Sequence, residues 1–103
     1  MDEIKRLHRA EFDRVMRNGK DLIILIYKEN DPYSTICLNT IKEVNALIGK
    51  SFDLYLVDSD AESDVVTALG TKLVPEYISM KQCKIFKRSN DLLKANEVLL
   101  LLK

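Results

Sequence analysis

Two cysteines and one histidine are the side chains of this sequence best suited to nucleophilic or redox chemistry. Cys37 lies near the beginning of a predicted helix, where the helix dipole would lower the pKa of a thiol. It also shares an apolar helical face with Ile41 and Val44, which favours a buried cysteine that packs as a small hydrophobe. Cys83 lies in a predicted β-hairpin, and we expect it to be inert as well. His8 has no nucleophile beside it and is predicted to be a surface residue.

A second group of candidates is the acidic cluster Asp58, Asp60, Glu62 and Asp64. A calcium-binding EF-hand loop needs Gly at its sixth position and Glu at its twelfth, and this segment has neither. Acids at the beginning of a helix complement its dipole, which is the simpler explanation. Two Cys and one His cannot form a four-ligand zinc site without carboxylates. The sequence therefore predicts no metal site and no cofactor.

The composition of the chain excludes several classes of protein and of binding partner. The chain has 103 residues, with 16 Lys plus Arg and 16 Asp plus Glu, so its formal net charge is zero. This balance argues against nucleic acid and against a membrane surface as partners. The length fits a single domain over 1–103, and no apolar run approaches the length of a membrane span. The charged amino end does not resemble a secretory signal, so we expect a cytoplasmic protein with reduced cysteines.

Hydrophobic periodicity predicts the elements that must position these residues. The run Leu22–Tyr27 is typical of a strand that is buried on both faces. Further strands are predicted over 4–7, 52–57, 76–80 and 83–87, and helices over 11–17, 34–48 and 91–102, with one more helix that ends at Gly70.

Turn and capping residues mark the ends of these elements. Gly49 and Lys50 are expected to stop the helix over 34–48. Ser59 and Glu62 form the pattern of a capping box before the helix that ends at Gly70. Lys81 and Gln82 are predicted to connect the last two strands, and Ser89 or Asn90 to cap the last helix. The order β-α-β-α-β-α-β-β-α predicts an α/β protein with a mixed sheet and helices on both of its faces.

This order resembles that of the thioredoxin superfamily, which has a three-layer α/β/α fold around a mixed central sheet. The segment from Ala10 to Asp21 resembles the family's amino-terminal helix leading into its central strand. Val74-Pro75 matches the place where the family has a cis-proline, although a sequence does not reveal the isomer. The resemblance covers essentially the whole chain.

The resemblance identifies a degenerate active site. Asp31, Pro32, Tyr33 and Ser34 stand where the family has two cysteines that flank two residues, and Pro-Tyr is the middle pair of glutaredoxins. Disulfide exchange needs a thiolate nucleophile and a second thiol that resolves the mixed disulfide, and a carboxylate and a hydroxyl can do neither.

Other family residues are replaced as well. The buried acid and lysine that assist proton transfer in thioredoxins correspond to Leu25 and Leu56. The tryptophan usual before the motif corresponds to Asn30. These departures imply a redox-inactive descendant, and we expect that the chain is not an enzyme.

The resemblance implies a binding role through the former active-site groove, which would hold another protein or an extended peptide. In the family the backbone before the cis-proline pairs with a bound peptide, and Val74 is the matching residue. Pro75, Glu76 and Asn30 would complete this groove, together with the loop near Arg88. Tyr33 is either an exposed contact residue or a ring folded onto its own loop.

Two other functions stay open. One is a weak thiol-disulfide oxidoreductase or glutathione-dependent enzyme that uses Cys37 or Cys83, with a role in cell redox homeostasis. The other is a homodimer formed through the leucine-rich end of the last helix, 98–102. The segment from Asn30 to Ser34, with Leu38 after it, is also similar to the circadian-clock KaiB family, from which the additional first strand and helix depart.

Overall fold

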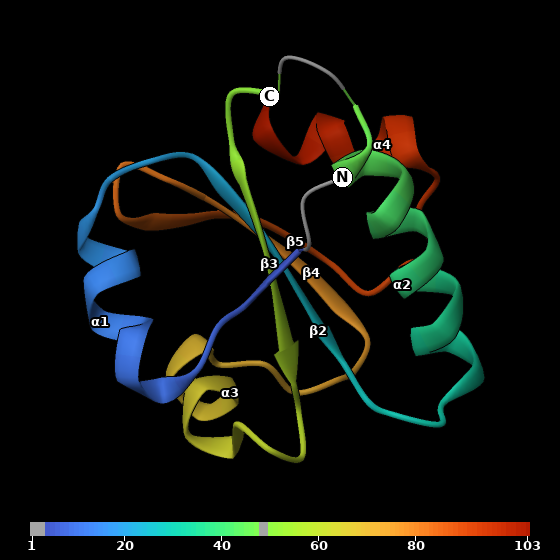
Figure 1. Cartoon of the computed structure of the whole chain (residues 1–103), viewed down its shortest axis with the longest axis horizontal. Coiled ribbons are helices and arrows are strands. Elements are labelled where there is room, and N and C mark those ends of the chain that lie inside the picture. Colours follow the sequence, from blue (N-terminus) through green and yellow to red (C-terminus); the bar gives the residue numbers. More distant parts are fainter. Residues whose placement is uncertain (1–3, 48–49) are drawn as a thin grey trace.

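The chain forms a central sheet with helices on both of its faces (Figure 1). The computed structural model describes residues 4–47 and 50–103. The strands are β1 (Lys5–Arg6), β2 (Leu22–Tyr27), β3 (Asp53–Asp58), β4 (Glu76–Lys81) and β5 (Lys84–Ser89). The helices are α1 (Arg9–Arg17), α2 (Pro32–Asn45), α3 (Ser63–Leu69) and α4 (Ala95–Leu99), and the 3₁₀ turn η1 (Leu100–Leu102) follows α4. The predicted element order and α/β fold class are confirmed.

The five strands are arranged in the order β1-β3-β2-β4-β5. The first three of these pair in parallel, because helical crossovers connect them along the chain. β4 runs antiparallel to β2, and β5 runs antiparallel to β4. All six residues of β2 are buried at the middle of the sheet, as its continuous apolar run predicts.

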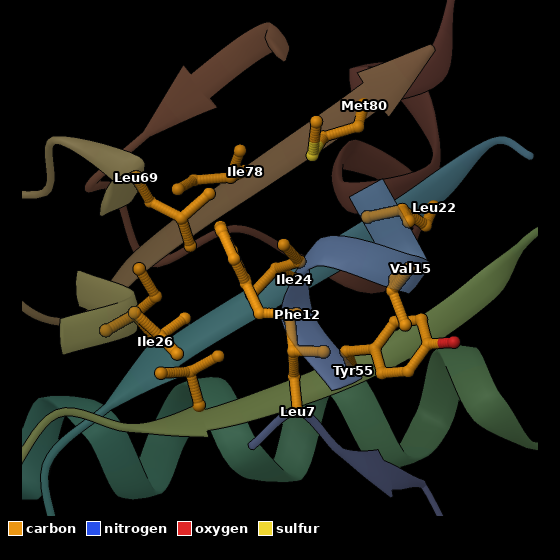
Figure 2. Close-up of a cluster of buried hydrophobic side chains, with 12 residues drawn as sticks. Leu7, Phe12, Val15, Leu22, Ile24, Ile26, Tyr55, Leu69, Ile78 and Met80 are labelled. Atoms are coloured by element: carbon orange, nitrogen blue, oxygen red, sulfur yellow. The ribbon is translucent and has the colours of Figure 1, made fainter. Parts of the chain in front are cut away.

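Alternate residues of β2 face two separate cores. Leu22, Ile24 and Ile26 pack with the buried residues of α1 and α3, and Figure 2 shows these side chains in one cluster with Phe12 and Leu69. The other core lies between the sheet and the pair α2 and α4. It contains Ile23, Leu25 and Tyr27 together with Cys37, Ile41, Val44 and Val98.

The ends of α2 differ from the prediction. The helix begins at Pro32, two residues early, because proline is well suited to the first helical position and Asp31 supplies the N-cap. It ends at Asn45 rather than at residue 48. The predicted stop at Gly49 lies outside the described residues.

The predicted capping box of Ser59 and Glu62 is wrong. Residues 59–62 form a turn that is closed by Asp58, whose carboxylate accepts hydrogen bonds from the main-chain N–H groups of Asp60 and Ala61. α3 therefore starts only at Ser63. The Glu62 carboxylate instead lies 2.7 Å from Nδ1 of the half-exposed His8. Among the described residues no cluster of His, Cys, Asp and Glu could hold a metal ion.

The last helix also starts later than predicted. α4 begins at Ala95, and its first turn is capped by Glu97, whose carboxylate accepts a hydrogen bond from the main-chain N–H of Lys94. Neither Ser89 nor Asn90 caps it. The hairpin turn is formed by Gln82 and Cys83 rather than by Lys81 and Gln82, because Lys81 pairs with Lys84 in the sheet.

The leucine-rich carboxyl end is mostly part of the core. Val98 and Leu101 are buried, whereas Leu100 is 56% exposed. Ser79, Lys81 and Lys87 donate hydrogen bonds to the last three main-chain carbonyl groups, those of residues 101–103. These donors satisfy carbonyl groups that a helix end leaves without partners. No helix in the described ranges has the length and apolar character of a membrane span.

Candidate functional site

Asp31 and Ser34 lie at the carboxyl end of β2, where they fix the beginning of α2. The Asp31 carboxylate accepts a hydrogen bond of 2.9 Å from the main-chain N–H of Ser34. The Ser34 hydroxyl is fully buried and accepts a 3.0 Å hydrogen bond from the main-chain N–H of Lys28. Both side chains therefore join the end of the central strand to the helix after it.

Tyr33 points out of this junction rather than onto it. Its side chain is 59% exposed. It lines an open hollow of about 380 Å³ together with residues from two other segments, Leu73–Pro75 before β4 and Asn90–Leu92 after β5. Of the two placements open for Tyr33 from the sequence, the exposed one is observed.

The segment before β4 forms the floor of this hollow. The Val74–Pro75 peptide bond is cis. Because β4 begins at Glu76, Val74 lies outside the sheet, and within the described residues its main-chain N–H and C=O form no hydrogen bond. Leu73 is 68% exposed, and Leu92 on the facing segment is 45% exposed. The hollow thus combines exposed apolar side chains with a main chain free to pair.

Asn90 is the residue of this site that sequence reasoning missed. Its side-chain amide donates hydrogen bonds to the main-chain carbonyl groups of Leu73, at 3.0 Å, and Pro75, at 3.1 Å. Asn90 therefore holds both sides of Val74 in place. The sequence places Asn90 beside the last helix, and no local pattern indicates a contact with a segment fifteen residues away.

Two of the predicted groove residues do not line the hollow. The Glu76 side chain is buried and accepts hydrogen bonds from Arg88, at 2.9 Å, and from the Thr71 hydroxyl, at 2.7 Å. Arg88 also donates to the carbonyl group of Leu69 at the end of α3. Glu76 thus stabilises the sheet beneath the site. Asn30 occupies the left-handed region, with φ of 61°, in the turn before Asp31.

The Cys37 thiol is buried in the core between the sheet and α2. Burial raises the pKa of this thiol, an effect opposed by a hydrogen bond with Tyr77 and reinforced by the negative charge of Asp31. A raised pKa keeps the sulfur in the thiol form, which is neither a nucleophile nor a metal ligand.

Cys83 is exposed, but it lies far from the hollow. It occupies the turn at one end of β4, whereas Pro75 precedes the other end. A strand of six residues separates them, which corresponds to about 20 Å. The two thiols therefore lie in different parts of the molecule, and neither lies in the hollow beside Pro75.

The strand positions beneath the motif are apolar. Leu25 and Leu56 lie opposite each other in the pairing of β2 with β3. Both belong to the core on the side of α2 and α4. Their alkyl side chains can neither donate nor accept a proton, so this pair offers no route for proton transfer to the residues above it.

Comparison with solved structures identifies a thioredoxin-like fold. The Malassezia sympodialis thioredoxin Mala s 13 superposes with a TM-score of 0.86 at 13% identity, over 98% of this chain and 90% of that one. Trxlp from Edwardsiella tarda superposes with a TM-score of 0.83 at 12% identity, over 98% of this chain and 100% of that one. A mutant thioredoxin from Halobacterium salinarum superposes with a TM-score of 0.81 at 12% identity, over 96% of this chain and 86% of that one.

The similarity to these proteins lies in the fold. No protein-family model matches the sequence, and no curated protein matches it significantly. The thioredoxin-like architecture that the element order and the Val74-Pro75 segment predict is confirmed. Its activity must be argued from the site itself.

Proposed function

We propose that this chain is a redox-inactive, thioredoxin-like binding protein that holds an extended segment of another protein in the hollow beside Pro75. The observation that carries the proposal is the use of Asp31 and Ser34 as structural groups. Each is committed to a hydrogen bond that fixes α2. The positions that would have to exchange disulfides therefore hold the scaffold together instead.

The hollow is suited to an extended main chain. The free N–H and C=O of Val74 can pair with a partner backbone as in strand addition. Tyr33, Leu73 and Leu92 surround this point with apolar surface that would be buried on binding. Asn90 already holds the main chain on both sides of Val74, which lowers the entropy cost of ordering it.

The proposal is tested by capturing binding proteins from a cell extract with the original chain and with single-residue variants. Immobilised protein is exposed to an extract of the cells that produce it, and bound proteins are compared for the original chain, Tyr33→Ala and Pro75→Ala. Leu100→Ala is the control, because Leu100 is as exposed as Tyr33 but belongs to η1. A partner lost with Tyr33→Ala and retained with Leu100→Ala supports the proposal. A partner retained by both groove variants contradicts it.

A weak thiol-disulfide oxidoreductase is the second candidate, and the exposure of Cys83 is the observation in its favour. Rapid labelling of Cys83 in the folded protein, with turnover of a disulfide substrate that Cys83→Ser abolishes, would establish it. Reaction of Cys37 is expected only after unfolding, because its thiol is buried.

A further inference from the structure

The end of the molecule that carries the hollow is strongly acidic, although the whole chain has no net charge. Figure 1 shows the loops that follow β2 and β3 and the loop before β4 at the same end of the sheet. The segment after β5 joins them through Asn90. These four segments, 28–31, 58–64, 70–75 and 90–94, carry seven carboxylates and three lysines, and the segment after β1, at the same end, adds His8 and Arg9.

Several of these carboxylates are free to act on a partner. Glu62 is paired with His8, and Asp31 and Asp58 accept hydrogen bonds from main-chain N–H groups. Within the described residues, the remaining four form no ion pair: Glu29, Asp60, Asp64 and Asp91. Asp91 lines the hollow itself, next to Leu92.

The opposite end of the sheet has the reverse charge. Segments 18–21, 50–52, 81–84 and 100–103 carry five lysine side chains and one aspartate side chain. The molecule is therefore polarised along its strands. Carboxylates clustered around an apolar hollow attract cationic segments and repel nucleic acids and anionic lipids.

We infer that the segment held in the hollow is an extended stretch of protein in which an apolar residue is flanked by lysine or arginine. The apolar side chain enters between Tyr33, Leu73 and Leu92, and the cationic side chains lie against Asp91 and the acids of the neighbouring loops. This inference rests on the proposed function, because it specifies the chemistry of the partner for the same site.

Three synthetic peptides test the inference by NMR titration of the labelled protein. All three share one apolar centre, and their flanking residues are lysine, glutamine or glutamate. We expect the lysine peptide to shift the amide resonances of Val74 and Asn90 most strongly and to bind most tightly. Its affinity should fall as NaCl is raised from about 0.05 to about 0.5 M, because salt screens exposed charges.

Variants that remove a single negative charge show which carboxylate attracts the lysine peptide. Asp91→Asn should weaken the lysine peptide about two- to fivefold, as expected for one exposed charge pair, and leave the glutamine peptide unchanged. Glu43→Gln, an exposed acid in the second half of α2, is the control and should change neither.

The outcomes separate this inference from the proposed function. Equal or tighter binding of the glutamine or glutamate peptide at the same resonances overturns the basic preference and leaves the hollow as a binding site. If none of the peptides shifts the resonances around Val74, the proposed function fails, and the inference fails with it.

Discussion

At the scale of single residues, Asp31 and Ser34 each have a structural role that a cysteine could not fill equally well. The Ser34 hydroxyl accepts a hydrogen bond from the main chain of Lys28 in a fully buried place. A thiol is a weaker acceptor than a hydroxyl. The Asp31 carboxylate caps α2 through the N–H of Ser34. An aspartate just before a helix is a preferred N-cap, whereas the partner of the Ser34 hydroxyl is visible only in the structure.

Ser34→Ala should lower the free energy of unfolding by about 0.5–1.5 kcal/mol, because it removes the hydrogen bond that the buried Ser34 hydroxyl accepts from the main-chain N–H of Lys28. Urea unfolding followed by circular dichroism measures the change. Thr35→Ala is the matched control. Its hydroxyl is exposed and donates to the carbonyl group of Asp31, so its loss should cost less than that of Ser34. Equal losses for the two variants would contradict the structural role of Ser34.

Stability should fall in alkali because of Cys37 and Tyr77. Burial raises the pKa of both groups above their ordinary values of 9.0 and 10.0. Above these values the unfolded chain releases protons that the folded chain retains, so unfolding becomes easier as pH rises. The full contribution is present below pH 9, and each group then contributes a loss of up to about 1.4 kcal/mol per pH unit.

Urea unfolding between pH 8 and pH 11 measures this dependence. Tyr77→Phe keeps the buried ring and removes the titrating hydroxyl, so the loss of stability above pH 10 should be less steep in this variant. If the free energy of unfolding falls with pH at the same rate in Tyr77→Phe and in the original chain, groups other than Tyr77 cause the loss of stability in alkali, which contradicts this prediction.

At the scale of elements, the hairpin between β4 and β5 carries backbone strain. Gln82 and Cys83 both occupy the left-handed region, with φ of 53° and 66°. A two-residue turn between strands requires this conformation, which Asn and Gly adopt more readily than Gln and Cys. The sequence signals for this turn are therefore weak, which explains why its position was predicted one residue early.

Replacing this turn by Gln82→Asn with Cys83→Gly should raise the free energy of unfolding by about 0.5–1 kcal/mol. Thermal unfolding of the double variant measures the gain. Cys83→Ser is the control, since it removes the thiol but keeps a residue with a side chain in the left-handed region, and its stability should be nearly unchanged. A double variant less stable than the original chain would contradict this account of the turn.

At the scale of the whole molecule, the strands were predictable and the meeting of distant segments was not. The apolar run of β2 and the spacing of Cys37, Ile41 and Val44 fix the layers, because burial imposes a period on each element. Asn90 reaches the main chain around Pro75 only through the pairing of β4 with β5. Sequence periodicity carries no information about such a contact, so the resemblance located the groove and the loop near Arg88, whereas the bonds of Asn90 to the main chain are visible only in the structure.

The capping errors have the same origin. Ser59 and Glu62 have the spacing of a capping box, but the groups of this box have other partners. The main-chain N–H of Glu62 donates to the carbonyl group of Asp58 and that of Ser59 to the carbonyl group of Tyr27, while the Glu62 carboxylate lies against His8. Tertiary partners thus overrode a local pattern. Such competition cannot be judged before the elements are placed together.

Reduction of a disulfide substrate by dithiothreitol, followed with and without the protein, tests the central claim that the site does not exchange disulfides. The account predicts that the original chain leaves the uncatalysed rate unchanged. It also predicts that Asp31→Cys with Ser34→Cys, verified as folded by circular dichroism, accelerates the reaction, because a thiolate is then placed at the beginning of α2. Acceleration by the original chain that disappears in Cys83→Ser or Cys37→Ser would contradict it.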